Sequence, residues 1–166
     1  MKDIKTNLQG IPTTENLFLS NIAEVKISYS TQVKASERRS ITSSRDAYEI
    51  LRMFWDIDTI EYVESMKVIL LNRANKVLGI ANLSTGGTSG CILDAKTVFQ
   101  YALKTNSSSI LLAHSHPSGN IKPSEQDLLI TSKIKEGAKL LDLALLDHLI
   151  ITAHDGYYSM ADEGVL

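Results

Sequence analysis

The order of apolar and polar residues along the chain predicts strands that alternate with helices. Segments that alternate in polarity or are rich in β-branched residues are typical of strands, and short apolar runs are typical of buried ones. Such segments occur at residues 24–30, 62–72, 76–84, 108–116 and 144–160, the last divided by a turn at Asp155 and Gly156. A hairpin-length connection separates the second segment from the third.

Three other segments carry apolar residues at helical spacing, each after a residue that can cap a helix. Asp94 precedes one of them, with apolar residues at 98, 99, 102 and 103, and Ser124 begins another. Ser44 precedes the first, whose expected apolar face consists of Ala47, Ile50, Leu51, Phe54 and Trp55. The resulting order of elements predicts an α/β protein with a mixed β-sheet flanked by helices.

Size and charge limit what this sheet can belong to. The 166 residues suit one domain, expected at 24–166, whereas residues 1–23 lack periodicity, which is typical of a poorly ordered N-terminal arm. Seventeen Lys and Arg against nineteen Asp and Glu leave a net charge of −2. The charge therefore gives no support to a nucleic-acid partner.

Cysteine content and hydropathy indicate the compartment. The single cysteine, Cys91, cannot form a disulfide within the chain, and it excludes zinc sites built on paired cysteines. The N-terminal residues lack the apolar core of a secretory signal, and no apolar run approaches the length that a bilayer requires. We therefore expect a cytoplasmic protein without a membrane partner.

The segment HSHPSGNIKPSEQD, residues 114–127, contains candidate metal ligands. His114 and His116 are two residues apart at the end of a predicted strand, so their side chains face the same way. Asp127 falls in the first turn of the next helix, and three such side chains would leave one tetrahedral position open, as in catalytic zinc sites. The same segment also fits a helix cap, in which Ser124 and Asp127 satisfy the first backbone amides. The pattern alone leaves both interpretations open.

Hydrolysis at such a site needs a group that takes a proton from water and passes it to the leaving amine. Glu64, inside an otherwise apolar strand segment, is the first candidate. Its alternative role is that of a solvent-facing residue, the commoner position of a strand glutamate. Glu61 competes with it, but two residues that are three positions apart on a strand face opposite sides.

HSHP, followed after six residues by SxxD and preceded by a glutamate on an upstream strand, resembles the JAMM motif of JAB/MPN metallopeptidases. Together with LLDHLIIT and YYSMADEG, it resembles more narrowly the RadC-type branch of that family, over about residues 24–166. The resemblance implies a cytidine-deaminase-like α/β architecture and a bound zinc ion. At position 115 this chain has Ser, whereas RadC-type members more often have Asn at the corresponding position. The roles that the resemblance implies are zinc ligands for His114, His116 and Asp127, general base and acid for Glu64, and an oxyanion donor for Ser124.

The sequence thus predicts a zinc-dependent hydrolase of the JAMM type that cleaves a peptide or isopeptide bond in a protein or peptide substrate. A non-catalytic JAB-type module that binds a protein or nucleic acid is the second hypothesis. A mononuclear iron enzyme with two histidines and a carboxylate is the third. His148 is expected to be a hydrogen-bonded structural residue, and the glycine-rich residues 85–90 are expected to form a flexible rim of the cleft.

Overall fold

Strands and helices alternate along the folded chain. The computed structural model describes residues 23, 25–30, 33–86, 92–154 and 156–166. Their elements, in chain order, are the 3-10 helix η1 (Ala35–Glu37), α2 (Ser44–Phe54), β1 (Ser65–Leu71), β2 (Val77–Thr85), α3 (Ala95–Lys104), β3 (Ser109–Ser115), α4 (Glu125–Lys139), β4 (Ala144–Ile151) and β5 (Tyr157–Ser159). From α2 onward, this order is the one that the sequence predicts.

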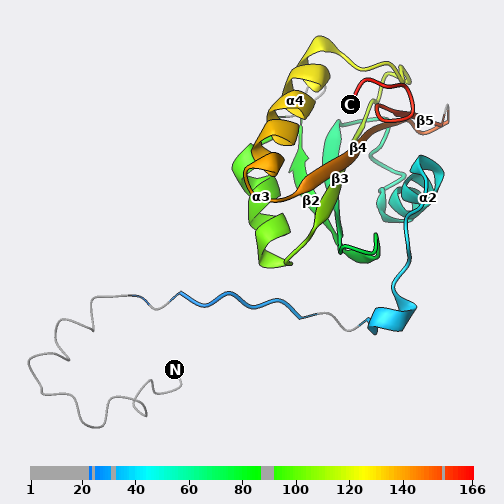
Figure 1. Ribbon diagram of the computed structural model, residues 1–166. Helices are drawn as coiled ribbons and strands as arrows, with labels where there is room; N and C mark the ends of the chain where they lie inside the picture. The colour runs from blue at the N-terminus through cyan, green and yellow to red at the C-terminus, as the bar shows by residue number, and fades with distance from the viewer. Residues whose placement is uncertain (1–22, 24, 31–32, 87–91, 155) are drawn as a thin grey trace, which may run out of the picture.

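The strands of the described residues form one mixed sheet in the order β2-β1-β3-β4-β5 (Figure 1). β1 pairs antiparallel with both β2 and β3, whereas β3 and β4 are parallel and are connected through α4. A parallel pair needs such a crossover, because both strands begin at the same end of the sheet. β3 is therefore central, and all of its residues are buried. The predicted α/β class and mixed sheet are confirmed.

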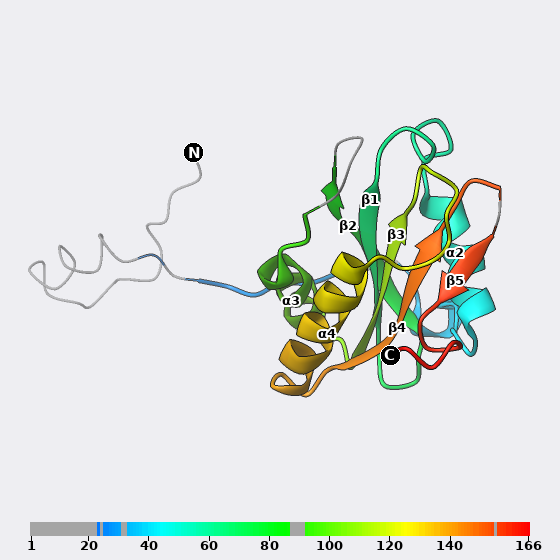
Figure 2. The same ribbon diagram turned by 90° about the horizontal axis from the view of Figure 1, so that it is seen from above.

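Helices cover both faces of the sheet (Figure 2). α2 shares a core with residues of one face, such as Ile69 in β1 and Leu111 in β3. α3 and α4 cover the other face, over residues such as Val68 and Leu112. The two cores alternate along each strand because successive side chains point to opposite faces. His114, two residues after Leu112, therefore lies on the face covered by α3 and α4.

Side-chain caps fix where two of the helices begin. At the start of α4, the Ser124 side chain accepts from the amide of Asp127 while the Asp127 side chain accepts from the amide of Ser124. This reciprocal pair is a capping box, which satisfies two backbone donors that the helix cannot satisfy itself. Asp94 caps α3 with its carboxylate. Both predicted helix starts are confirmed.

Three details of the predicted helices are wrong. Ser44 is the first helical residue of α2 rather than its cap, because Ser43 forms a capping box with Asp46. Phe54 and Leu103, which their spacing placed on buried faces, are 58% and 54% exposed. Each lies at the C-terminal end of its helix, where periodicity does not reveal whether another element lies opposite.

The strand predicted at residues 24–30 is also wrong. Residues 25–30 have no regular secondary structure, and Val25 and Ile27 are exposed. The alternation of polarity is present, but a strand also needs a neighbour to satisfy its backbone. The Tyr29 hydroxyl donates to the carbonyl of Leu78 in β2 at 2.6 Å, which is a side-chain contact rather than a ladder.

Several expectations fall outside the described residues. They concern the N-terminal arm, most of the glycine-rich segment with Cys91, and Asp155.

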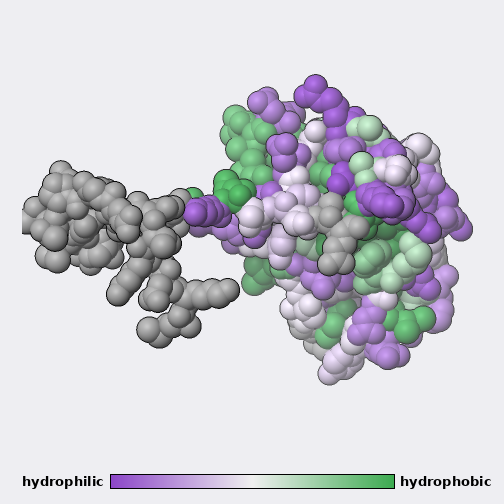
Figure 3. Space-filling model, turned by 90° about the horizontal axis from the view of Figure 1, so that it is seen from below, coloured by the Kyte–Doolittle hydropathy of each residue, from purple (hydrophilic) through white to green (hydrophobic). Residues whose placement is uncertain are grey.

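On the face seen from below, apolar residues form patches separated by hydrophilic residues (Figure 3). Among the described residues, no helix combines the length and the apolar character needed to span a bilayer.

Candidate metal centre

The central strand and the helix that follows it bring three candidate residues together. His114 is in β3, and Asp127 is in the first turn of α4. His116 lies one residue beyond β3, although the predicted strand included it. Its amide donates to the carbonyl of Ile151 at 3.0 Å, which continues the pairing with β4. The side chain of His116 therefore stays on the same face as that of His114.

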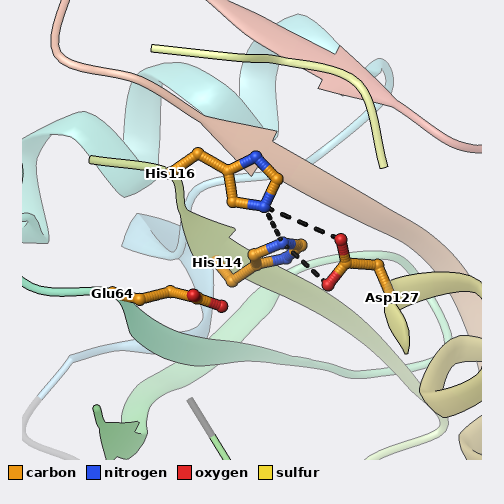
Figure 4. A group of neighbouring side chains, drawn as sticks. All are labelled: Glu64, His114, His116 and Asp127. Atoms are coloured by element: carbon orange, nitrogen blue, oxygen red, sulfur yellow. Dashed lines mark hydrogen bonds and ion pairs between the residues drawn. The ribbon is translucent and has the colours of Figure 1, made fainter. Parts of the chain in front are cut away.

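The three side chains converge on one point (Figure 4). The Nε2 atoms of His114 and His116 are 2.9 Å apart. Asp127 Oδ1 lies 3.1 Å from the first of these nitrogens, and Oδ2 lies 3.6 Å from the second. The ligand atoms of a tetrahedral zinc ion, each about 2.0–2.1 Å from the metal, are about 3.3 Å from one another. The observed spacings of 2.9, 3.1 and 3.6 Å lie around this value, with Oδ1 of Asp127 toward His114 and Oδ2 toward His116.

Hydrogen bonds at the opposite ring nitrogens leave the Nε2 atoms as ligands. His116 Nδ1 is 2.5 Å from the carbonyl oxygen of Asn120, which can only accept, so this Nδ1 carries the proton. His114 Nδ1 is 2.9 Å from His148 Nε2. With its proton on Nδ1 alone, each ring offers the lone pair of Nε2 to a metal ion, and Asp127 offers a carboxylate oxygen beside them. Two ring nitrogens and a carboxylate arranged in this way would suit a cation.

Asp127 uses its two carboxylate oxygens for different purposes. Oδ2 accepts from the amide of Ser124 at 2.7 Å and from its hydroxyl at 2.6 Å, whereas Oδ1 faces His114. The helix cap and the ligand, which the sequence offers as alternatives, are thus compatible in one side chain. Burial would raise the pKa of this carboxyl, but the favourable interactions with His114, His116 and Ser124 hold the pKa well below its usual range. The hydrogen bond with Asp127 in turn raises the pKa of His116.

Glu64 approaches the same point from the start of β1 (Figure 4). It lies one residue before β1, not inside the strand as predicted, and its carbonyl accepts from the amide of Gly86 at 2.7 Å. Because Met66 pairs with His114, the residue two positions earlier shares the face of the histidines. Each residue of the group Glu64, His114, His116 and Asp127 offers one possible ligand atom, and these four atoms all lie within 4.8 Å of one another.

Glu61, the competing candidate for the base, lies elsewhere. Its carboxylate forms an ion pair with His154 at 3.3 Å, and both side chains are largely exposed. Both glutamates precede β1, so the expectation that they occupy one strand is wrong. The preference for Glu64 over Glu61 nevertheless agrees with their positions.

Ser115, between the two histidines, holds the Glu64 segment in place. Its side chain is buried and lies on the opposite face from the histidines. The hydroxyl oxygen accepts from the amide of Ser65 at 3.0 Å, and the hydroxyl donates to the carbonyl of Val63 at 3.4 Å. These contacts join the strand that carries the histidines to the residues on either side of Glu64. The period of two in a strand could have indicated that Ser115 faces away from the histidines.

Two residues behind His114 complete the site. His148 in β4 and Thr131 in α4 are both buried. His148 Nδ1 is 2.6 Å from Thr131 Oγ1, and its Nε2 contacts His114. Burial holds the pKa of His148 well below its ordinary value, which favours the neutral ring. The sequence predicts a hydrogen-bonded His148 but does not name its partners, and it gives no sign of Thr131 as part of the site.

The candidate residues border a cleft with a volume of about 480 Å³. Glu64, His116 and Asp127 line it, whereas His114 is fully buried behind them. The cleft gives a ligand access to the point where the side chains converge.

Comparisons with known proteins identify the family of the chain. Residues 41–165 match the family model of the RadC-like JAB domain. The chain is 43% identical over 127 residues to a UPF0758 protein of Flavobacterium johnsoniae, which covers 76% of this chain and 54% of that protein. It is also 43% identical over 129 residues to a UPF0758 protein of Porphyromonas gingivalis, covering 78% and 56% respectively.

A UPF0758 protein of Clostridioides difficile is 31% identical over 176 residues, covering 98% of this chain and 74% of that protein. The chain spans about half the length of the relatives from Flavobacterium and Porphyromonas. Because the family match extends over most of its residues, the chain belongs to the family of RadC-like JAB domain proteins.

Proposed function

We propose that this protein is a zinc-dependent hydrolase that cleaves an amide bond in a peptide or an isopeptide linkage. The observation that carries the proposal is the convergence of Glu64, His114, His116 and Asp127 beside an open cleft. Two imidazoles and a carboxylate are a ligand set that catalytic zinc sites use, with the fourth position left for the reaction. Membership in the family of RadC-like JAB domain proteins supports the same function.

The residues divide the work between holding the metal and moving a proton. His114, His116 and Asp127 would hold the zinc ion. When bound, zinc lowers the pKa of a coordinated water to about 7 and polarises the substrate carbonyl. Glu64, whose carboxylate lies near the same point, accepts the proton of the attacking water and delivers it to the leaving amine.

Ser124 is proposed to donate to the oxygen that becomes negative during the attack. In the structure its hydroxyl proton goes to Asp127 Oδ2, and the residue also lines the cleft. The oxyanion role therefore requires the hydroxyl proton to rotate toward the substrate, which a serine hydroxyl can do. The bond from the amide of Ser124 to Asp127, at 2.7 Å, keeps the carboxylate in place during this rotation.

A protein or peptide is the proposed substrate. Apolar side chains of Met66, Leu93 and Ile130 line the cleft together with polar groups, and this mixture suits a peptide with both kinds of side chain. The proposed compartment is the cytoplasm, on the basis of the single cysteine in the sequence.

Metal content and cleavage, measured on the same variants, test this function. The wild type and Glu64→Gln, purified without added metal, are expected to hold about one zinc ion, because Glu64 is not a ligand, and His116→Ala is expected to lose it. In a peptide-library cleavage screen, Glu64→Gln should be about 10²–10⁴-fold slower than the wild type, because it cannot transfer the proton. Glu61→Gln is the matched control and should keep both zinc and activity.

Each other outcome favours a different function. Zinc binding by the wild type without cleavage of any peptide would favour the non-catalytic module. Iron in place of zinc would favour the iron enzyme. A wild type that takes up no zinc even on titration would contradict the proposal, and the segment 114–127 would then serve as a turn and a helix cap.

A further inference from the structure

His148 has no part in the proposed chemistry, yet it is fully buried directly behind a proposed ligand. It lies in β4, where it pairs in register with Leu112 of the neighbouring β3. Its ring nitrogens contact two different residues, His114 at 2.9 Å and Thr131 at 2.6 Å. Its ring therefore links the proposed ligand His114 to helix α4.

The direction of these hydrogen bonds follows from the one proton of Thr131. Its Oγ1 lies 2.5 Å from the backbone carbonyl oxygen of Asp127, one turn earlier in α4. Two oxygens this close need a proton between them, and the carbonyl has none, so the Thr131 hydroxyl donates to Asp127. A threonine inside a helix commonly forms this bond to the carbonyl four residues back. The hydroxyl oxygen is then left to accept.

The positions of the ring protons of His148 and His114 follow from this. Thr131 Oγ1 accepts from His148 Nδ1, so the proton of the His148 ring is on Nδ1 and its Nε2 is an acceptor. His148 Nε2 then accepts from His114 Nδ1. A neutral His114 with its proton on Nδ1 has its lone pair on Nε2, which is the nitrogen that faces His116 and Asp127.

We propose that His148 and Thr131 are positioning residues that fix the ring tautomer of His114 and thereby prepare its Nε2 as a metal ligand. This proposal deepens the proposed function and rests on it. His116 obtains the same tautomer from a backbone carbonyl, that of Asn120. His114 is fully buried in the central strand and obtains it from side chains, which substitution can remove.

The chain of hydrogen bonds also connects two ligands to each other. It begins at the backbone carbonyl of Asp127 and ends at the ring of His114. The carboxylate of the same Asp127 lies on the other side of that ring, 3.1 Å from its Nε2. One turn of α4 therefore supplies a ligand oxygen and also orients the neighbouring ligand nitrogen.

Zinc affinity in matched variants tests the proposal. Thr131→Val keeps the shape of the side chain but removes the acceptor, and His148→Phe keeps a ring but removes both nitrogens. Each is expected to weaken zinc binding by about 10–100-fold, the usual effect of removing a group that orients a metal ligand. Thr131→Ser keeps the hydroxyl, so its zinc affinity should stay within a few-fold of that of the wild type. Circular dichroism establishes that each variant is folded.

Nitrogen-15 NMR of the histidine rings in the zinc-free wild type tests the tautomers without any metal. The spectrum is expected to show the proton on Nδ1 of both His114 and His148. A proton on His114 Nε2, or folded Thr131→Val and His148→Phe proteins with unchanged zinc affinity, would overturn the proposal. If the wild type shows the expected tautomers but takes up no zinc, the result contradicts the proposed function and supports the proposed hydrogen bonds from Thr131 through His148 to His114.

Discussion

At the scale of single residues, the two oxygens of Asp127 link the stability of a helix to the geometry of the proposed metal site. Oδ2 is bound by the amide and hydroxyl of Ser124, and Oδ1 faces His114. The cap holds the carboxylate in one orientation, so that Oδ1 is already in place for an ion. Weakening the cap should therefore affect both the helix and the ligand.

Ser124→Ala should lower both the free energy of unfolding and the zinc affinity. Loss of a serine cap usually costs about 0.5–2 kcal/mol. Urea unfolding of the zinc-free protein would measure this loss of stability. Ser43→Ala is the matched control, because Ser43 forms the same capping box with Asp46 at the start of α2. It should lose similar stability and keep full zinc affinity. Equal zinc affinities for the two variants would show that the cap does not orient Asp127.

The sequence predicts the residues of the site that are close in the chain better than those that are distant. His114, His116 and Asp127 occupy one segment, in which the strand period places both histidines on one face and Asp127 falls in the first turn of the next helix. The roles of Thr131 and His148 depend on how α4 packs over β3 and β4, which no local period encodes. A hydrogen-bonding partner that comes from another element can be found only once the pairing of the strands is known.

At the scale of elements, α3 and α4 approach each other closely at Gly137. A Cβ atom built on Gly137 would lie 2.8 Å from Phe99 Cζ and 2.9 Å from Phe99 Cε2. Carbon atoms of different residues do not come this close in a folded protein unless one of them moves. The glycine, unfavourable inside a helix, thus leaves room for the aromatic ring of α3.

Gly137→Ala is expected to destabilise the protein although alanine favours helices. The gain in helix propensity is about 1 kcal/mol, but overpacking against Phe99 costs about 1–3 kcal/mol. The expected net loss is about 1 kcal/mol in urea unfolding. In a Phe99→Leu background the crowding disappears, so the same substitution should become neutral or stabilising. A stabilising Gly137→Ala in the wild type would contradict this account.

The strands that the sequence predicts correctly pair in the sheet, whereas residues 25–30 form no strand. β3 is an apolar run that lies buried at the centre of the sheet, as its composition predicts. Residues 24–30 have the alternation of a strand, but residues 25–30 form none. Alternation describes the two faces of a strand and gives no information about a neighbour along its edge.

At the scale of the whole molecule, Asp147 joins the end of the chain to the sheet. Its carboxylate accepts from the hydroxyl of Ser159 at 2.5 Å and from the amides of His148 and Ala161 at 2.7 and 3.0 Å. Burial nevertheless raises the pKa of this carboxyl above its ordinary value. Folding therefore favours the protonated form of Asp147.

This pKa shift predicts how stability depends on pH. Because the folded-state pKa is the higher one, the contribution of Asp147 to stability is complete below the unfolded-state pKa of about 3.9 and decreases as pH rises through the folded-state pKa. The difference in unfolding free energy between the wild type and Asp147→Asn should therefore fall as pH rises above about 4, in urea titrations at successive pH values. Asp58→Asn removes an exposed carboxylate and serves as the control. A difference that grows with pH would show the opposite shift.

The class of the fold follows from the sequence more readily than the arrangement of the sheet. The alternation of strand and helix periods is enough to predict an α/β protein, because each element carries its own pattern. The strand order β2-β1-β3-β4-β5 depends on which backbones pair, and the single parallel pair of the described strands depends on the crossover through α4. These relations join residues far apart in the chain.

The proposed ligands His114, His116 and Asp127 lie within residues 114–127, and this has a consequence for the unfolded chain. A loop this short closes at a small entropic cost even without the sheet, so an ion held by these residues as proposed would also have some affinity for the unfolded chain. An ion that binds both states stabilises the native one by less than its native affinity implies.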